Sequence, residues 1–212
     1  TVIVAGSAFM SNFEIQAELD NYLTPAYSNY TILENIVRTV NPVVLSTIAE
    51  VQAAEEGVNF TIRGIATSNA SGYDKETAFF DCIYLQDGTA GINAFPVSEA
   101  IMAGQTVEIS GKTSSYNGER QILVKSVRLI DARVKDLPDP IDLKVEEAAA
   151  GNNLGSLVTV SGKVQSIELS NGIVESIYVS HGNDVCRVFI DGYITSTKTI
   201  PGLRVGRTVI VT

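Results

Sequence analysis

Short runs of alternating apolar and polar residues, separated by turn residues, cover the chain from about Val51 onward. Alternation with a period of two, in runs rich in β-branched and aromatic residues, is typical of strands that bury one face. The first half of this region therefore predicts five strands, near residues 58–67, 78–87, 91–95, 105–114 and 121–131. Two tight connections separate them, because Asp87-Gly-Thr-Ala-Gly91 and Asn117-Gly118 supply glycines for turns, the second of type I′.

Two short helices complete this unit. The segment Ile48–Glu55 predicts a helical lead-in, and Val97–Met102, after Pro96, predicts a short helix between the third and fourth strands. Five short strands with a glycine inside the first indicate a five-stranded Greek-key barrel. Gly64 and Gly162 are expected where a strand bends sharply to serve both halves of a barrel.

The same pattern recurs later in the chain. Residues 59–66 resemble residues 157–164, residues 83–88 resemble 177–182, and residues 103–109 resemble 205–211. Three ordered matches at offsets of 98, 94 and 102 residues predict a duplicated domain rather than a solenoid. The second copy reaches only its fourth strand by Thr212, so we expect its fifth strand to come from elsewhere.

A known family shares these motifs. Its pattern is an aromatic-rich strand ending in Gln-Asp-Gly, a glycine-flanked Val-x-Val strand, and a Tyr-Asn-Gly hairpin followed by Gln-Ile. Here these are residues 79–92, 104–111 and 116–122. They resemble the OB-fold modules of secreted bacterial nucleases and phosphoesterases. The resemblance covers 51–133 well and 155–212 more weakly, since His181 replaces the aspartate. It implies two consecutive five-stranded OB-type Greek-key barrels, the second lacking its last strand, in an extracellular or cell-surface protein.

The first 47 residues differ from the rest. Val2–Ala5 predicts a strand, and Tyr30–Val40 predicts a helix with one apolar face. This β-α segment resembles the last unit of a flavodoxin-like or glutamine-amidotransferase-like domain and is expected to be the remnant of an upstream α/β domain. The predicted organisation is the N-terminal segment at 1–47, OB-fold module 1 at 48–135, and OB-fold module 2 at 136–212. We interpret the chain as part of a larger polypeptide, with neighbouring domains as partners.

The net charge of the chain bears on whether it binds nucleic acid. Apolar residues make up 45% of the 212 residues, so each module can bury a core, but the net charge is −9 and no segment is basic. Binding of polyanions depends largely on Lys and Arg that displace counterions, so this balance weakens the expectation of nucleic-acid binding. The sequence contains no apolar stretch long enough for a membrane helix, and membrane insertion is not expected.

Catalytic and metal-binding motifs are not found. The only histidine is His181, in a predicted turn, and Gly-x-Ser-x-Gly and Walker A motifs are missing. Asp136, Asp139 and Asp142 are interpreted as solvated loop charge, and Cys82 and Cys186 as two buried thiols. We therefore predict no enzyme activity, no metal and no cofactor.

The barrel surface is the most promising site, because OB folds bind ligands on strands two and three and the adjacent loops. Stacking of bases needs aromatic faces with nearby cations. The candidates in module 1 are Arg63, Tyr73, Phe80, Tyr84, Lys112, Tyr116, Arg120 and Lys125; module 2 offers Tyr178, Tyr193, Lys163, Arg187, Arg204 and Arg207. Tyr84 and Tyr178 share one repeat position, so packing of the barrel wall is an alternative role for them.

Three functions follow. The first hypothesis is single-stranded nucleic-acid binding by modules accessory to a nuclease or phosphoesterase. The alternatives are a structural spacer or protein-interaction module and, favoured least because aromatic residues are only 7% of the chain and Trp is absent, carbohydrate binding.

Overall fold

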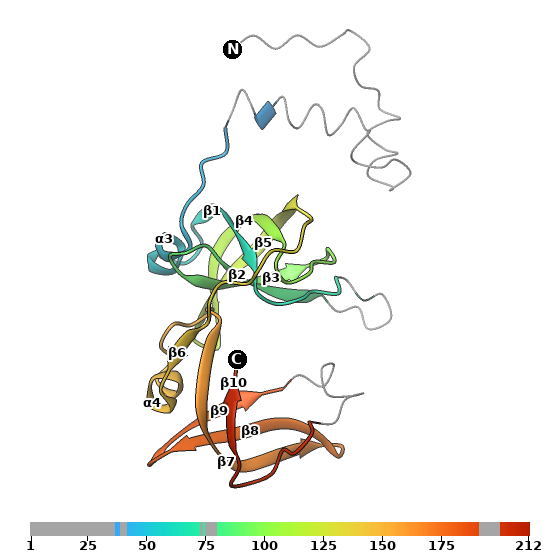
Figure 1. Ribbon diagram of the computed structural model, residues 1–212. Coiled ribbons are helices and arrows are strands. Elements are labelled where there is room, and N and C mark those ends of the chain that lie inside the picture. The colour runs from blue at the N-terminus through green and yellow to red at the C-terminus, as the bar shows by residue number, and fades with distance from the viewer. Residues whose placement is uncertain (1–36, 39–41, 73, 75–79, 191–199) are drawn as a thin grey trace. The chain divides into compact units, whose positions relative to one another are not determined.

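The computed structural model describes residues 37–38, 42–72, 74, 80–190 and 200–212 (Figure 1). The chain divides into two compact units, Thr1–Val44 and Leu45–Thr212. The predicted N-terminal strand and nearly all of the predicted helix over Tyr30–Val40 lie outside the described residues, apart from a helical stretch at residues 37–38. The second unit contains both predicted barrels.

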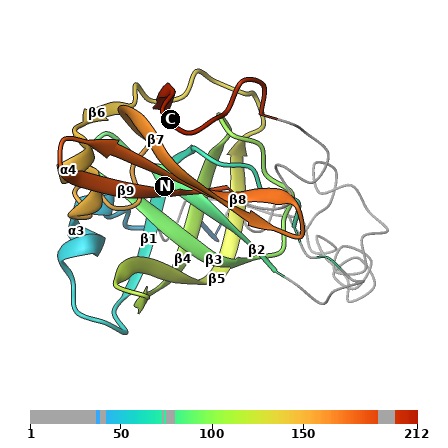
Figure 2. The same ribbon diagram turned by 90° about the horizontal axis from the view of Figure 1, so that it is seen from below.

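The first barrel is closed. Its elements are α3 (Ile48–Ala53), β1 (Asn59–Ala66), β2 (Asp81–Gln86), β3 (Gly91–Val97), β4 (Thr106–Tyr116) and β5 (Glu119–Asp131). The strand order is β1-β2-β3-β5-β4, and β4 pairs again with β1. The β3–β5 pair is parallel and the other pairs are antiparallel. This is the five-stranded Greek-key arrangement that the strand pattern predicts, visible in Figures 1 and 2.

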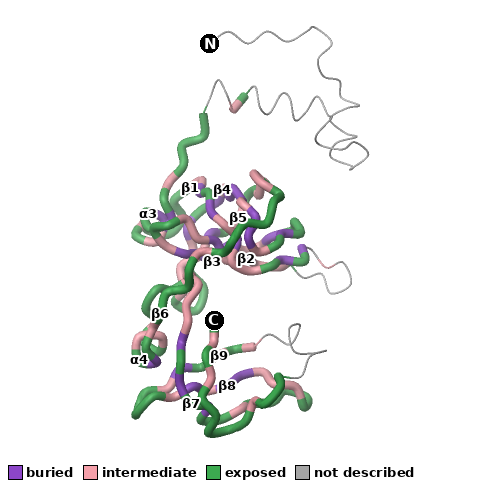
Figure 3. Tube along the Cα trace, viewed as in Figure 1, coloured by how far each residue is buried: buried purple, intermediate pink, exposed green. Residues whose placement is uncertain are grey.

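Along each strand, every second side chain points into the barrel, and these apolar side chains fill its interior. Buried residues concentrate there in Figure 3. In β2, Ile83 and Leu85 are fully buried while Tyr84 between them is only partly buried. The largest buried side chains come from all five strands and α3: Ile48, Ile62, Ile83, Leu85, Ile92, Ile109 and Ile122. Full burial of such a side chain contributes roughly 1.5–3 kcal/mol, so this core is the main source of stability.

Helix α3 forms the predicted lead-in. Thr47 caps its N-terminus by accepting a hydrogen bond from the Glu50 N–H, and the Glu50 carboxylate accepts one from the Thr47 N–H at 2.8 Å. This capping box satisfies two helix-end donors. Asp87, in the β2–β3 turn, accepts a third bond from the Ile48 N–H at 2.8 Å. The helix buries Ile48 and Val51 and is thereby held on the barrel.

The predicted helix over Val97–Met102 is wrong. Val97 ends β3, and Ile101 forms an antiparallel bridge with Ala70. The backbones of Ala70 and Ile101 exchange hydrogen bonds of 2.9 and 3.0 Å. The N–H and C=O groups of Ile101 are therefore not available for the hydrogen bonds of a helix. A turn at Gly104, with φ of +90°, then leads into β4. The apolar run that follows Pro96 contains no local sign of this pairing with a distant loop.

The second sheet repeats much of this plan. It contains β6 (Ile141–Leu143), α4 (Val145–Ala149), β7 (Val158–Ser170), β8 (Ile173–His181), β9 (Asp184–Phe189) and β10 (Thr208–Val211). The order is β10-β7-β8-β9, with β6 parallel to β7, and the core includes Val145, Val160, Ile177, Val179 and Cys186. Within the described residues the sheet has no equivalent of β5, as expected for a barrel lacking its last strand.

The strand registers of the two sheets correspond. Gly64 pairs with Val107 in the first sheet, and Gly162 pairs with Val209 in the second. A Cβ on Gly64 would lie 2.7 Å from the Gln86 carbonyl oxygen, and one on Gly162 would lie 2.7 Å from the carbonyl oxygen of Ser180. Each glycine therefore permits a close approach of two backbones, as predicted for a bending first strand.

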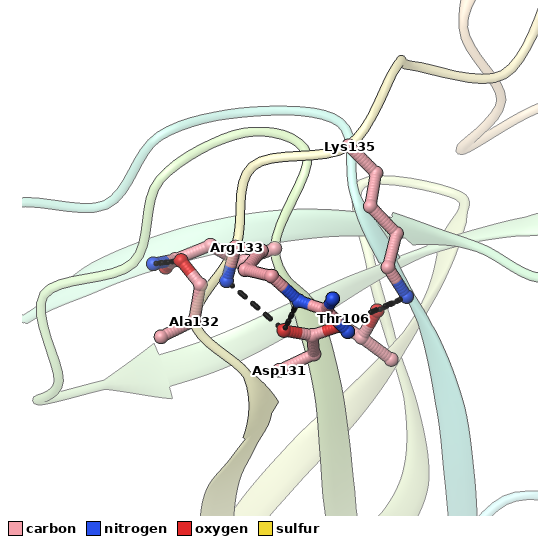
Figure 4. A network of polar contacts seen from close by, with 6 residues as sticks. Thr106, Asp131, Ala132, Arg133 and Lys135 are labelled. Carbon is pink, nitrogen blue, oxygen red and sulfur yellow. Dashed lines mark hydrogen bonds and ion pairs between the residues drawn. The ribbon is translucent and has the colours of Figure 1, made fainter.

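A polar network follows the end of β5 (Figure 4). The Asp131 carboxylate accepts hydrogen bonds from the Arg133 guanidinium at 2.9 and 3.0 Å and lies 3.3 Å from the Lys135 ammonium. The Arg133 hydrogen bond, followed by that of Lys135, holds the pKa of Asp131 well below its usual value. Lys135 also donates to Thr106 Oγ1 at 2.9 Å. Residues 131–135, here called the strap, are thus fastened to the start of β4.

The tie between Asp87 and α3 predicts a pH-dependent stability. Its partial burial opposes ionisation, but hydrogen bonds from Thr89, Ile48 and Ala90 outweigh burial and lower the pKa of Asp87. The stabilisation is therefore present above the ordinary pKa of 3.8 and lost as pH falls through the lower folded value. We expect Asp87→Ala to reduce the free energy of unfolding by about 1 kcal/mol at neutral pH.

Urea denaturation at several pH values measures this effect, with Asp136→Ala, an exposed linker carboxylate, as the matched control. The difference between Asp87→Ala and the unaltered protein should shrink below about pH 4. A difference that is constant with pH would contradict the assignment.

The close approach at Gly64 predicts a second effect on stability. Gly64→Ala places a methyl group against the Gln86 carbonyl and should destabilise the first barrel by roughly 1–3 kcal/mol. Thermal unfolding measures it, and Ser126→Ala, at an exposed position of β5, should have little effect. Equal melting temperatures for the two variants would refute the role given to Gly64.

Candidate functional site

The register of β2, β3 and β5 aligns their outward side chains in rows. Tyr84 pairs with Asn93, and Asn93 pairs with Gln121, so these three lie side by side across the strands. Phe95 pairs with Leu123 in the next row. Since alternate residues of a strand share a face, all five point away from the buried Ile83, Ala94 and Ile122 side of the sheet.

A groove of about 630 Å³ follows these rows. Its lining comes from β2, β3, the end of β4, the β4–β5 turn and β5: Cys82, Tyr84, Asn93, Phe95, Tyr116, Asn117, Glu119, Gln121 and Leu123. We call it the β2–β3–β5 groove. It combines three aromatic rings with three amides and one carboxylate, a mixture of flat apolar surface and hydrogen-bonding groups that suits an organic ligand with both characters.

Tyr84 and Glu119 form the polar centre of the groove. The Tyr84 hydroxyl donates to Glu119 Oε2 at 3.1 Å, and the Asn93 side chain also hydrogen-bonds to Tyr84. Burial, followed by the Glu119 charge, raises the pKa of Tyr84 to about 12. Burial also raises the pKa of Glu119, against the lowering effect of the Tyr84 hydrogen bond. The pair therefore holds the ring of Tyr84 in a fixed position with its hydroxyl protonated at neutral pH.

The β4–β5 turn forms one end of the groove. Asn117 and Gly118 have φ of +49° and +87°, the positive values that a type I′ turn requires, as the sequence predicts. Tyr116, which pairs with Glu119, is 68% exposed. An aromatic ring so exposed at a hairpin tip contributes little to the core and is available to a ligand.

Two predicted cations lie near the groove. Lys112 pairs with Leu123, so it shares the outward face one strand beyond the groove lining. Lys125 follows Leu123 by two residues on β5, and both lysines are exposed. They provide positive charge at one side of the groove, at the end away from Glu119 and Tyr116.

The two predicted arginines belong to other contacts. Arg63 forms an ion pair of 2.8 Å with Glu108, whose side chain is buried. Arg120 donates to the Ala54 carbonyl at 2.6 Å and to Ser115 at 3.2 Å, and lies 3.8 Å from Glu56. Neither lines the groove, and these contacts fix β1, β4 and the α3 end within the barrel.

The remaining predicted aromatics lie apart. Phe80 precedes β2, is 39% exposed and does not line the groove. Tyr73 lies outside the described residues. Of the eight candidates, the structure thus places Tyr84 and Tyr116 in the groove and Lys112 and Lys125 beside it.

Most of the polar lining and Phe95 were not predicted from the sequence. Strand alternation could have found Asn93 and Phe95, because they flank Ala94 on a strand whose inward residues are apolar. Glu119, Gln121 and Leu123 join them only through the parallel β3–β5 pairing, which no local pattern reveals.

Other candidate chemistry finds no support within the part of the chain that the structure describes. There, no cluster of three or more His, Cys, Asp or Glu side chains is arranged to hold a metal ion. Cys82 is half-buried and Cys186 buried, and neither is in a disulfide. His181 is exposed at the end of β8. No described helix has the length and apolar character needed to cross a membrane.

Comparisons with known proteins give a partial structural match. No family model and no curated protein matches the chain. Among solved structures, the chain is similar to one titled "Structure of the hypothetical protein ygiW from E. coli", at 19% identity and a TM-score of 0.33. The match covers 41% of this chain and 90% of that one. At that TM-score the likeness supports no conclusion about function.

The Tyr84–Glu119 pair predicts a measurable change in tyrosine ionisation. Glu119→Gln removes the charge but leaves the burial, so the pKa of Tyr84 should fall only part of the way from about 12 toward 10.0. Tyrosinate absorbance in an alkaline titration reports it, and Tyr84→Phe identifies which transition belongs to Tyr84. Glu56→Gln, an exposed carboxylate outside the groove, serves as the control. An unchanged Tyr84 transition in Glu119→Gln would show that the two groups do not interact.

Proposed function

We propose that this chain is a non-catalytic binding segment and that its first barrel binds single-stranded nucleic acid in the β2–β3–β5 groove. The observation that carries the proposal is the set of aromatic rings and amides gathered on this face by strand register, with Lys112 and Lys125 alongside. The β2–β3 face and the β4–β5 loop are the surfaces through which OB folds bind oligonucleotides.

Each group has a specific role in this proposal. Tyr84, Phe95 and Tyr116 offer faces on which bases stack, at roughly 1–3 kcal/mol per base. Asn93, Asn117 and Gln121 offer both donors and acceptors to base edges. Lys112 and Lys125 neutralise phosphates that run along the β4 side of the groove. One complete groove with two nearby lysines supports weak, salt-sensitive binding that favours no particular sequence.

Glu119 sets a limit on the affinity. As a carboxylate it repels a phosphate that approaches the Tyr116 end of the groove, which directs the backbone of the ligand toward Lys112. Its raised pKa means that acidification removes this charge sooner than for an ordinary glutamate. The proposed binding therefore becomes tighter as pH falls toward the pKa of Glu119.

The resemblance to modules of secreted bacterial nucleases and phosphoesterases supports an accessory role. In that role the chain would hold nucleic acid for a catalytic domain of the same extracellular or cell-surface protein, in keeping with a two-barrel chain that we consider a tandem repeat. A structural spacer is the alternative for a chain of net charge −9, and it predicts no ligand in the groove.

A neutral glycan is a second candidate, and one observation favours it. None of the nine residues that line the groove is a cation, while three are amides and three are aromatic. Sugar rings pack on aromatic faces and exchange hydrogen bonds with amides and carboxylates without any need for positive charge. The two candidates differ in salt dependence, since only phosphate binding releases counterions.

A titration distinguishes these functions. We expect a fluorescent single-stranded oligonucleotide to bind the full chain at about 50 mM salt and to dissociate as salt is raised. Tyr116→Ala should weaken binding at least about fivefold, since one stacking face is lost. Lys112→Gln should reduce the slope of log affinity against log salt by about 0.7. Lys144→Gln, which removes an exposed lysine at the start of α4, should alter neither.

The other outcomes are equally informative. No binding at low salt would sink the nucleic-acid proposal. Salt-independent binding of neutral oligosaccharides that Tyr116→Ala abolishes would establish the glycan candidate instead. Circular dichroism confirms that each variant is folded, and because Tyr116 and Lys112 are both exposed, their replacement should leave the melting temperature unchanged.

A further inference from the structure

The β8–β9 hairpin of the second sheet matches the β2–β3 hairpin of the first in strand register. Ile83 pairs with Ala94 in the first sheet, and Ile177 pairs with Val188 in the second. Tyr84 pairs with Asn93, and Tyr178 pairs with Arg187. The two hairpins therefore correspond residue for residue over 83–94 and 177–188, and the first alone has a register shift next to this stretch, between Asp81 and Ile83.

Besides Tyr84 and Tyr178, this correspondence extends to one further aromatic pair, Phe95 and Phe189. At the offset of 94 residues that relates the two hairpins, Phe189 occupies the position of Phe95, and Tyr178 that of Tyr84. Phe189 is 58% exposed. A large aromatic ring that is more than half exposed on a strand, beside a second ring, forms an apolar surface that a folded protein rarely leaves without a use. The second sheet thus has an outward aromatic face of its own.

The two faces differ in one decisive position, since Arg187 stands where the first sheet has Asn93. The Arg187 guanidinium lies over the Phe189 ring, with its central carbon 5.3 Å from the ring centroid. Its Nε–H donates to Ser176 Oγ at 2.8 Å, and Ser176 is fully buried. The guanidinium is therefore held over the ring before any ligand binds, which reduces the entropy lost on binding.

Two carboxylates near Arg187 compensate its positive charge only weakly. Its terminal nitrogen lies 3.9 Å from Glu168 and 4.0 Å from Glu175, and all three side chains are close to half exposed. Exposed ion pairs at that distance contribute little and are screened by salt. Lys163 adds a second exposed cation to this face, because it pairs with Ser180, two residues beyond Tyr178 on the same side of β8.

We propose that Tyr178, Arg187 and Phe189 form a second binding face for single-stranded nucleic acid and that Arg187 gives this face its preference for an anionic ligand. A phosphate binds the outward edge of the guanidinium and displaces the weak contacts with Glu168 and Glu175, while bases stack on Phe189 and Tyr178. The inference rests on the function proposed for the first barrel, and it adds the cation that the lining of the first groove lacks.

Charge favours this occupant over a glycan. A neutral sugar would gain from the aromatic rings but would have no need for a guanidinium positioned by Ser176 and Phe189. An anionic strand uses both, because the charge-assisted contact and the stacking surface lie within one pair of side chains.

Two variants of the full chain separate the two contributions, with a fluorescent single-stranded thymidine oligonucleotide as the probe. Arg187→Gln should reduce the slope of log affinity against log salt by about 0.7, since one phosphate contact is lost. Phe189→Leu should weaken binding at least about fivefold and leave that slope nearly unchanged, since stacking is lost but charge is kept. Lys144→Gln again serves as the control for loss of a positive charge in the same module, and thermal unfolding confirms folding.

The outcomes distinguish this inference from the proposed function. If the unaltered chain does not bind the oligonucleotide, both fail. If it binds, and Tyr116→Ala weakens binding while Arg187→Gln behaves like Lys144→Gln, the second face is refuted and the first groove stands. Loss of affinity and slope in Arg187→Gln, alone or together with the Tyr116 effect, establishes the second face.

Discussion

The closure of the first barrel depends on the close approach of two backbones at Gly64. β1 pairs with β4 along residues 59–65 and with β2 at its end, so one strand serves both halves of the sheet. The turn of direction brings Gly64 so near the Gln86 carbonyl that a side chain has no room. Closure of the barrel separates an apolar interior from a polar exterior, and the groove lies on that exterior because β3 and β5 complete the circle.

The local sequence pattern predicted the strands well because the alternation of apolar and polar residues is present within each strand. Ile83 and Leu85 alternate with Tyr84 in any register, and Asn117-Gly118 specifies its turn without help from the rest of the chain. The groove could not be predicted to the same extent. Glu119 meets Tyr84 only because β3 and β5 pair in parallel, and that pairing depends on the global path of the chain.

The errors have the same origin. The segment after Pro96 looks helical by itself, but its amide and carbonyl groups pair with Ala70, far away in sequence. Arg63 looks like a free surface cation, but strand register places it opposite Glu108. In each case a partner from another strand or loop decides the role of a residue whose local sequence suggests another. The match between Phe95 and Phe189 was missed for a simpler reason, since the offset of 94 residues was not followed beyond residues 83–88.

The strap has a mechanical consequence. β5 ends at Asp131, beside the first residue of β4, so a pull on the chain beyond residue 135 would otherwise peel β5 from its neighbour one hydrogen bond at a time. The contact of Lys135 with Thr106 joins the strap to β4 and receives that force first, whereas the ion pair of Arg133 with Asp131 lies within the strap. The strap therefore opposes the separation of β5 from β4 at the point where the chain leaves the barrel.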